Sequence, residues 1–434
     1  VCYSSINIYI SMTKFLNLTL SLILISSNAS AEINSGDTSW ILTSSALVLF
    51  MTLPGLALFY AGLVHSKNVL SVLAQNFGVA CLMSVLWVII GYSLAFSQGE
   101  SQFVGDFNKI LLRNTDGLSG TIPEILFVVF QMTFSIITPA LIIGAYVERI
   151  KFSVVLIFSA LWLIVVYCPV AFWVWGGGFL AQMGVKDFAG GIVVHTTAGI
   201  AALVIAIVLG KRKTFEKNTI SPPHGPVLTM IGACMLWVGW FGFNGGSALA
   251  ADGSAAKAIL VTHIAASLGA LSWAVIEWIR FGKPSLVGMV TGMVAGLATI
   301  TPASGFVGVE GGVILGVAGG LICYYAVDLI RLKLKIDDSL DVFAVHGVGG
   351  ILGTILCAWL MNSNRGGVGF DEGLSLIDHL KIQSYSVLVA IIWTAVLTYF
   401  ILKIISMFTS LRVDIEQETD GLDTSLHGES GYNK

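Results

Sequence analysis

Long apolar runs, separated by short polar segments, fill most of the chain. Each run is close to the roughly 20 residues that a helix needs to cross the hydrocarbon core of a bilayer. Eleven such runs lie at 39–63, 69–96, 122–146, 152–174, 188–209, 227–247, 256–279, 285–302, 311–331, 341–361 and 384–411. The pattern therefore predicts an all-α membrane protein with eleven transmembrane helices.

The composition agrees with this pattern. Of the 434 residues, 56% are apolar and only 11% are charged, whereas soluble domains carry roughly 25% charged residues. The net charge of −3 provides no basic surface for DNA or RNA. The composition thus excludes a soluble enzyme and a nucleic-acid-binding protein.

A shorter pattern precedes the first run. Residues 12–31 begin with Met-Thr-Lys, continue with the apolar stretch 15–25 and end in Asn-Ala-Ser-Ala. A positive start, a short apolar core and a small-residue ending are typical of a secretory signal peptide; an interfacial first helix is the alternative. We expect residues 1–31 to be a removed leader, so that the mature chain begins at Glu32 outside the membrane.

The distribution of Lys and Arg supports this topology. An exterior N-terminus places thirteen of these residues in inner segments and six in outer loops. Cytoplasmic loops carry the excess of basic residues in membrane proteins. We therefore expect a transmembrane domain over residues 32–411 and a polar, cytoplasmic C-terminal tail over residues 412–434.

Two histidines lie inside predicted spans. His195 is on the fifth span and His346 is on the tenth, and ionisable residues within a membrane are functional candidates. Five spans form an odd number, so two such halves have opposite orientations, which predicts a 5+5 inverted repeat followed by one final helix. His195 lies eight residues beyond Asp187, or about 12 Å along a helix, which places it near mid-membrane.

The chemistry of this pair follows from its surroundings. His346 lies nine residues beyond Asp337, about 14 Å into its own span, so both imidazoles approach the same depth. Neither has Cys, Asp or Glu beside it at that depth, so we expect no metal site. A neutral imidazole has one donor and one acceptor nitrogen, which suits a polar relay; a pair of satisfied packing residues is the alternative.

Aromatic residues gather at the predicted outer ends of the third, fourth and sixth spans. Phe130 and Phe134 lie four residues apart on one helix face, as do Phe243 and Ser247. Trp175 precedes three glycines. Aromatic residues are common at membrane interfaces, but ring faces with a hydroxyl nearby can also bind a small cation.

Taken together, these strings resemble the ammonium transporter family (the Amt, Mep and Rh proteins), and specifically its Amt branch of bacterial type. Trp175 favours the Amt branch, because Rh members usually lack this tryptophan. The resemblance covers nearly all of the chain after the leader, and the matching segments are 130–140, 144–150, 175–178, 187–195, 239–247, 282–286, 341–350 and 421–429.

The resemblance implies a homotrimer in the bacterial inner membrane, with a narrow hydrophobic pore in each subunit. Matched by motif, Phe134, Trp175 and Ser247 would form an outer site that recruits ammonium or methylammonium. Phe134 would also stack on Phe243 to form a gate. A cytoplasmic PII-type regulatory protein would be a partner at the inner face.

The remaining roles concern the pore itself. The resemblance makes His195 and His346 the relay past which ammonia is conducted after ammonium loses its proton, and it makes Asp187 a structural residue near the recruitment site. No cofactor is expected, and no nucleophile or catalytic motif accompanies the histidines, so an enzyme is not expected. A channel for another small neutral molecule and an ammonium sensor are the alternative functions.

Overall fold

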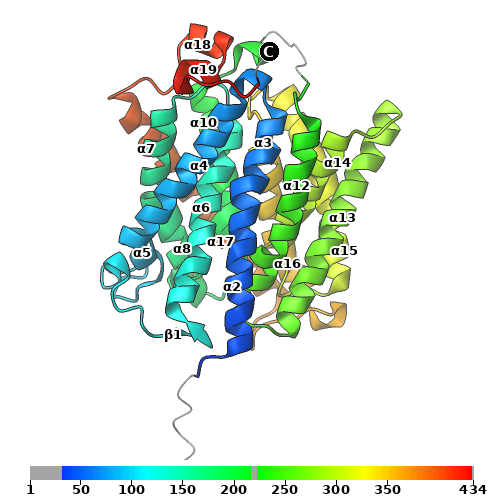
Figure 1. Cartoon of the computed structure of the whole chain (residues 1–434). Helices are drawn as coiled ribbons and strands as arrows, with labels where there is room; N and C mark the ends of the chain where they lie inside the picture. Colours follow the sequence, from blue (N-terminus) through cyan, green and yellow to red (C-terminus); the bar gives the residue numbers. More distant parts are fainter. Residues whose placement is uncertain (1–31, 217–221, 433–434) are drawn as a thin grey trace, which may run out of the picture.

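The computed structural model describes residues 32–216 and 222–432, which form one bundle of long helices. The helices run side by side, and the two short tail helices lie across one end of the bundle (Figure 1). The expected leader, residues 1–31, lies outside the described residues.

The first five spans form the first half of the bundle. Several are interrupted by short 3-10 or π-helical turns, labelled η. In chain order the elements are α2 (Ser35–Phe50), η1 (Met51–Leu56) and α3 (Ala57–Leu63); η2 (Ser66–Asn68), α4 (Val69–Leu86), η3 (Trp87–Gly91) and α5 (Tyr92–Phe96); α6 (Glu124–Tyr146); α7 (Phe152–Trp162), η5 (Leu163–Tyr167), α8 (Cys168–Val174) and α9 (Phe179–Gln182); η6 (Gly191–Thr196) and α10 (Thr197–Leu209). The turn η4 (Ile110–Leu112) and the two-stranded hairpin of β1 (Leu118–Ser119) and β2 (Ile122–Pro123) join the second span to the third.

The other spans and the tail complete the chain. The elements are α11 (Lys213–Glu216); α12 (Pro226–Trp240) and η7 (Phe241–Gly245); α13 (Gly253–Phe281); α14 (Leu286–Ile300); α15 (Val309–Asp328) and η8 (Leu329–Lys333); η9 (Phe343–Gly347) and α16 (Val348–Leu360); η10 (Ser363–Arg365); α17 (Leu376–Ser406); α18 (Ile415–Asp420) and α19 (Leu422–His427).

The predicted count of eleven spans is confirmed. Within the described residues, ten helical segments are long and apolar enough to cross a membrane, and α14 is the shorter eleventh. The largest difference from the prediction is at the last span, which begins at Leu376 instead of residue 384. Ser375 and Asp378 form a capping box that starts this helix, and the polar side chains His379 and Gln383 of its first turns are buried.

Turns of π-helix occur in both halves, and η6 and η9 both lie at the start of their spans, whereas the turn η3 of the second span has no counterpart in α13. The paired turns lie in the first and sixth spans (η1 and η7), the fourth and ninth (η5 and η8), and the fifth and tenth (η6 and η9). A π-turn inserts one residue into a helix and is frequent at functional sites. This correspondence agrees with two repeats of five spans, with α17 outside both.

Glycines bring three helices of the second half into close contact. A Cβ on Gly296 of α14 would overlap the carbonyl oxygen of Ala265 of α13, and one on Gly292 would lie 2.5 Å from the Gly269 oxygen. On α15, a Cβ on Gly316 would lie 2.7 Å from the Cα of Ala265. Small residues at these crossings let the helix backbones approach closely.

This packing makes a direct prediction. We expect Gly296→Ala to lower the free energy of unfolding by about 1–3 kcal/mol, because the added methyl group overpacks the α13–α14 crossing. Gly253→Ala is the control, because no atom lies within 4 Å of the added Cβ there. The measurement is the thermal unfolding of the purified protein in detergent, and equal midpoints for the two variants would contradict the prediction.

Candidate functional site

His195 and His346 meet at the centre of the molecule. Their Nδ1 atoms are 3.2 Å apart, and the two rings lie nearly parallel, with centroids 5.2 Å apart and an interplanar angle of 14°. The side chains are almost completely buried, 1% and 4% exposed. The structure therefore brings the two histidines of the fifth and tenth spans together at one hydrogen bond.

Asp187 sets the start of the helix that carries His195. Its Oδ1 accepts hydrogen bonds from the amides of Gly190 and Gly191, and its Oδ2 accepts them from Ile192 and Val193, at 2.6–3.1 Å. These four N–H groups would otherwise be unsatisfied at a helix start. Burial raises the pKa of the Asp187 carboxyl, although these N–H groups act to lower it.

A glycine then allows the turn into η6. Gly190 has a φ of 114°, a backbone conformation that residues with a Cβ rarely adopt. The amide of His195 donates to the carbonyl of Gly190 at 2.9 Å, a five-residue step that makes this turn π-helical. The position of the first imidazole thus depends on the loop that holds Asp187 and Gly190.

A second aspartate starts the helix that carries His346. Asp338 accepts a hydrogen bond from the amide of Phe343 at 2.7 Å, whereas its neighbour Asp337 forms an ion pair with Arg212 at 2.8 Å. Burial and the charge of Asp341 raise the pKa of the Asp338 carboxyl to about 7, although backbone N–H groups lower it. The helices that carry His195 and His346 therefore both begin at an aspartate that accepts hydrogen bonds from backbone amides.

Aromatic rings close the pore on the His195 side. Phe134 of α6 and Phe243 of η7 are stacked, with centroids 4.3 Å apart and an interplanar angle of 25°. The Trp175 ring meets Phe134 edge-on at 5.8 Å, and its Nε1 donates to the carbonyl of Asp187 at 2.8 Å. Three of the residues selected from the sequence are therefore in contact here.

Ser247 lies one turn beyond Phe243 and is partly exposed. Its hydroxyl donates to the carbonyl of Phe243 at 2.8 Å, so its oxygen lone pairs remain available to a ligand. Phe130 packs edge-on against Phe134 and is fully buried. The Nε1 of Trp173 donates to the carbonyl of Phe103 at 2.7 Å.

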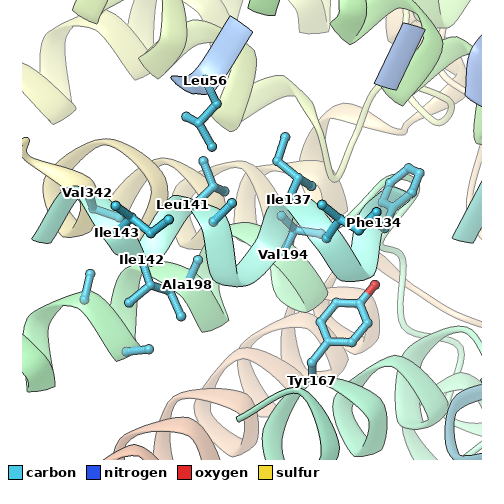
Figure 2. Packing of buried hydrophobic residues seen from close by; sticks show 14 of the residues in the cluster. Leu56, Phe134, Ile137, Leu141, Ile142, Ile143, Tyr167, Val194, Ala198 and Val342 are labelled. Atoms are coloured by element: carbon cyan, nitrogen blue, oxygen red, sulfur yellow. The ribbon is translucent and has the colours of Figure 1, made fainter. Parts of the chain in front are cut away.

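A small apolar cavity lies beside both histidines, with Phe243 in its wall. Its volume is about 10 Å³, roughly the space of one water molecule. Figure 2 shows part of its wall, with Leu56 across from Ile137 and Leu141 of α6. The whole lining consists of Met51, Leu56, Phe59, Ile137, Leu141, Val194, His195, Leu236, Trp240, Phe243, Val294 and His346.

A much larger cavity opens on the other side of His346. It has a volume of about 1010 Å³ and extends from His346 to charged residues that include Lys211 and Asp328. Phe59, Val294 and His346 line both cavities, so the two are neighbours along one path. The pore is thus closed by rings at one end and wide at the other.

Trp240 is a pore residue that the sequence analysis missed. Its ring is stacked on His195, with centroids 5.5 Å apart and an interplanar angle of 15°, and its Nε1 donates to Thr301 at 2.9 Å. It lies three residues before Phe243. Helical spacing puts these two residues on one face, which is the signal that could have found it.

Charged side chains also form a buried network between the pore and the tail. Glu148 accepts hydrogen bonds from Asn68 and Arg212 at 2.9 and 2.7 Å, and Arg212 also pairs with Asp337. Burial raises the pKa of the Glu148 carboxyl, but the hydrogen bond from His65 and the charge of Arg212 lower it well below its ordinary value.

A bundle of eleven apolar spans in two repeats, with a narrow apolar cavity at its centre, defines a membrane transporter for a small solute. The model of the Ammonium Transporter Family matches residues 39–432. The chain therefore belongs to the ammonium transporter family, whose members are multi-pass membrane transporters and not enzymes.

Individual relatives agree with this assignment. The chain is 45% identical over 407 residues to an ammonium transporter of Aquifex aeolicus, covering 93% of this chain and 95% of that protein. The crystal structure of Saccharomyces cerevisiae Mep2 matches with a TM-score of 0.81 and 36% identity, covering 91% and 92% of the two chains. A protein described as a sensor Amt protein matches with a TM-score of 0.85 at 28% identity, covering 90% and 98%.

The raised pKa of Asp338 predicts how stability depends on pH. An unfolded aspartate ionises near pH 3.8, whereas the native Asp338 keeps its proton up to about pH 7. Between these values the native state binds more protons, so this group makes the free energy of unfolding fall as the pH rises, until it levels off above about pH 8. We expect that the free energy of unfolding of Asp338→Asn will not show this decrease with rising pH.

The measurement is the thermal unfolding midpoint at a series of pH values from about 5 to about 9. Asn can still accept the hydrogen bond from Phe343, so the start of η9 is retained in the variant. Asp116→Asn is the control, because Asp116 is exposed. Parallel pH profiles of the wild type and Asp338→Asn would contradict the prediction.

Proposed function

We propose that this transporter recruits ammonium at the end of the pore marked by Phe134 and Trp175, removes its proton and conducts ammonia past His195 and His346. The observation that carries the proposal is the pair of buried imidazoles 3.2 Å apart. The pair lies between the stacked rings and the wide cavity, where a solute without charge can pass.

The electrostatic cost of the path favours deprotonation. Moving an ion into an apolar lumen costs several to tens of kcal/mol. Removing a proton at pH 7 costs at most about 4.6 kcal/mol, if a pKa near 10.4 is taken as the ceiling. Deprotonation is therefore the cheaper route, and it excludes potassium, which has no proton to lose.

The recruitment site is proposed at Phe134, Trp175 and Ser247. The first two rings contact each other, and each ring face can contribute roughly 0.5–2 kcal/mol to the binding of a small cation. Ser247 supplies an oxygen acceptor for an N–H group. Phe134 and Phe243, whose rings are stacked, are proposed as the gate, and Asp187 is proposed to be structural because four backbone amides occupy its carboxylate.

The imidazoles serve as the polar relay in an otherwise apolar path. One Nδ1 donates to the other, so each ring keeps its Nε2 for a passing solute or a proton. The Nε2 of His195 has no hydrogen-bond partner among the described residues. A buried polar atom without a partner is costly, and a transient ammonia molecule would satisfy it.

We expect His195→Ala or His346→Ala to lower ammonium transport roughly 100-fold, the usual contribution of a positioned proton-transfer group, or to let potassium pass. The measurement is the current of reconstituted protein after ammonium pulses and, separately, after potassium pulses. His263→Ala is the matched control, because His263 also lies within a span but on the exposed face of α13.

Wild-type ammonium rates in both pore variants, with potassium still excluded, would contradict the relay.

The recruitment site can be tested apart from the histidine pair, in the same assay, with Trp175→Leu. Losing one ring contact should raise the half-saturating ammonium concentration roughly 2- to 30-fold, without admitting potassium. Competition by methylammonium tests the alternative of a channel for an unrelated neutral molecule.

A sensor function is the second candidate, because a sensor Amt protein has the same fold over 90% of this chain. A sensor would bind ammonium at the outer rings without sustained flux. The reconstituted protein would then bind methylammonium but give no steady ammonium current.

The arrangement in the membrane is also a proposal. We infer an exterior N-terminus after cleavage of residues 1–31, a transmembrane domain over 32–411 and a cytoplasmic tail over 412–434, in a bacterial inner membrane. The excess of basic residues in the inner loops supports this orientation. The wide cavity then opens to the cytoplasm, where a PII-type protein could cover it.

Exposed apolar residues on α13, such as Leu260 and Leu271, are suited to contact with lipid or with the neighbouring subunits of a homotrimer.

The tail is held to the cytoplasmic end by specific hydrogen bonds. The amide of Leu422 donates to the side chain of Asn68 at 2.8 Å, and Asp423 accepts from the amide of Ser71 at 2.8 Å. Asn68 is also a partner of Glu148, so the tail contacts the buried network that leads to Asp337, at the start of the His346 segment.

We therefore expect deletion of residues 412–434 to reduce ammonium transport. A coupling of about 1 kcal/mol through this network corresponds to roughly a fivefold lower rate. Asp423→Ala should have a smaller effect in the same direction, and the exposed Asp420 provides the control variant Asp420→Ala. Currents are compared per correctly assembled oligomer. Unchanged flux in the deletion variant would count against a role of the tail.

A further inference from the structure

Gln383 lies on α17, the helix that belongs to neither repeat. This helix contacts η6, α10, η5 and α7 of the first half and α16 of the second. Gln383 is completely buried near the start of the helix. A buried side-chain amide needs partners for its two N–H donors and its oxygen acceptor. The hydrogen-bond partners of Gln383 therefore identify the segments that this side chain connects.

Those partners are backbone groups from both halves. The Oε1 of Gln383 accepts from the amide of Lys186 at 2.8 Å, and its Nε2 donates to the carbonyl of Lys186 at 2.7 Å. The same Nε2 donates to the carbonyl of Thr354 at 3.0 Å. One side chain thus joins the residue before Asp187 to the helix that carries His346.

The two segments joined in this way also pack on each other directly. A Cβ on Gly350 of α16 would lie 2.6 Å from the carbonyl oxygen of Gly191 and 2.8 Å from the Cβ of His195. A Cβ on Gly191 would lie 2.8 Å from the hydroxyl of Thr354. The contact between η6 and α16 therefore runs from His195 outward to Thr354, and Gln383 fixes its outer end.

The loop before η6 has other contacts as well, among them the ion pair of Lys186 with Asp371 at 2.8 Å. Phe188 donates to the carbonyl of Pro302 at 3.0 Å, and Asp187 receives Trp175. Gly190 and Gly191 follow at once, and glycine offers little resistance to rotation of the backbone. Without Gln383, the loop would lose the hydrogen bonds of the Lys186 backbone and, with them, the link through this side chain to the Thr354 carbonyl of α16.

We propose that Gln383 is a positioning residue for the paired imidazoles. Its amide holds the backbone of Lys186 against that of Thr354 and so fixes η6 relative to α16, which keeps the two Nδ1 atoms within hydrogen-bond distance. This inference rests on the proposed relay of His195 and His346.

The test uses three full-length variants of the reconstituted protein. Gln383→Leu removes all three hydrogen bonds, and Gln383→Glu keeps the shape and the acceptor but, as a carboxylate, has no donor for the two carbonyls. Ser386→Ala is the matched control, because Ser386 is equally buried on the same helix and its hydroxyl donates within that helix, to Ile382. The milder Glu variant keeps the test informative if the Leu variant does not fold.

Two quantities are measured on each folded variant: the maximal ammonium rate and the ¹⁵N resonances of the histidine rings in labelled protein. We expect both Gln383 variants to lower the rate about 10- to 100-fold, as small misplacements of reacting groups do, and to lose the resonances of the Nδ1–Nδ1 hydrogen bond. Ser386→Ala should keep both.

Two outcomes would overturn the inference. The first is a folded Gln383→Leu protein with a wild-type rate, and the second is a lowered rate with unchanged histidine resonances, which would indicate a role in stability alone. His195→Ala is measured in parallel. Wild-type transport in that variant would refute the relay itself, while the resonances of the Gln383 variants would still report whether this residue positions the rings.

Discussion

The hydrogen bond between two imidazoles in an apolar tube is the constraint around which the pore is built. It needs two helices, from opposite ends of the bundle, to place their rings within 3.2 Å of each other. Asp187 starts one helix and Asp338 starts the other. Glycines at the contact between η6 and α16 leave no room for a Cβ, so the backbones approach closely enough for the rings to meet.

The two ends of the pore differ in structure, and the proposed mechanism gives them different roles. In that mechanism the stacked rings at one end keep out water and ions, whereas charged groups line the cavity of about 1010 Å³ at the other end. A solute that has lost its charge in the narrow part can regain it in the wide part. The buried network around Glu148 forms a wall of this cavity and also contacts the tail through Asn68.

Much of this architecture could be predicted from the sequence. The eleven spans and the two histidines stand out because charged and polar residues are rare within a membrane. The predicted start of the last span is too late for a physical reason. A hydropathy scale counts Gln383 as a polar residue outside the membrane, but in the structure it is buried and its side chain forms hydrogen bonds with three backbone groups. The π-helical turns leave no compositional signal, and Trp240 lies among several other aromatic residues at the end of its span. The roles of Phe134, Trp175 and Ser247 came from the resemblance to a family, because aromatic spacing alone also fits a membrane anchor.

The stacked pair of Phe134 and Phe243 has a consequence for the kinetics of the molecule. With centroids 4.3 Å apart, the rings leave no standing passage, so each permeation event waits for a thermal swing of at least one side chain. Such rotations in a packed interior are activated events, slower than free diffusion. In the proposed mechanism, flux through this pore is therefore intermittent on the molecular scale, and its temperature coefficient reports the barrier to ring rotation instead of the viscosity of water.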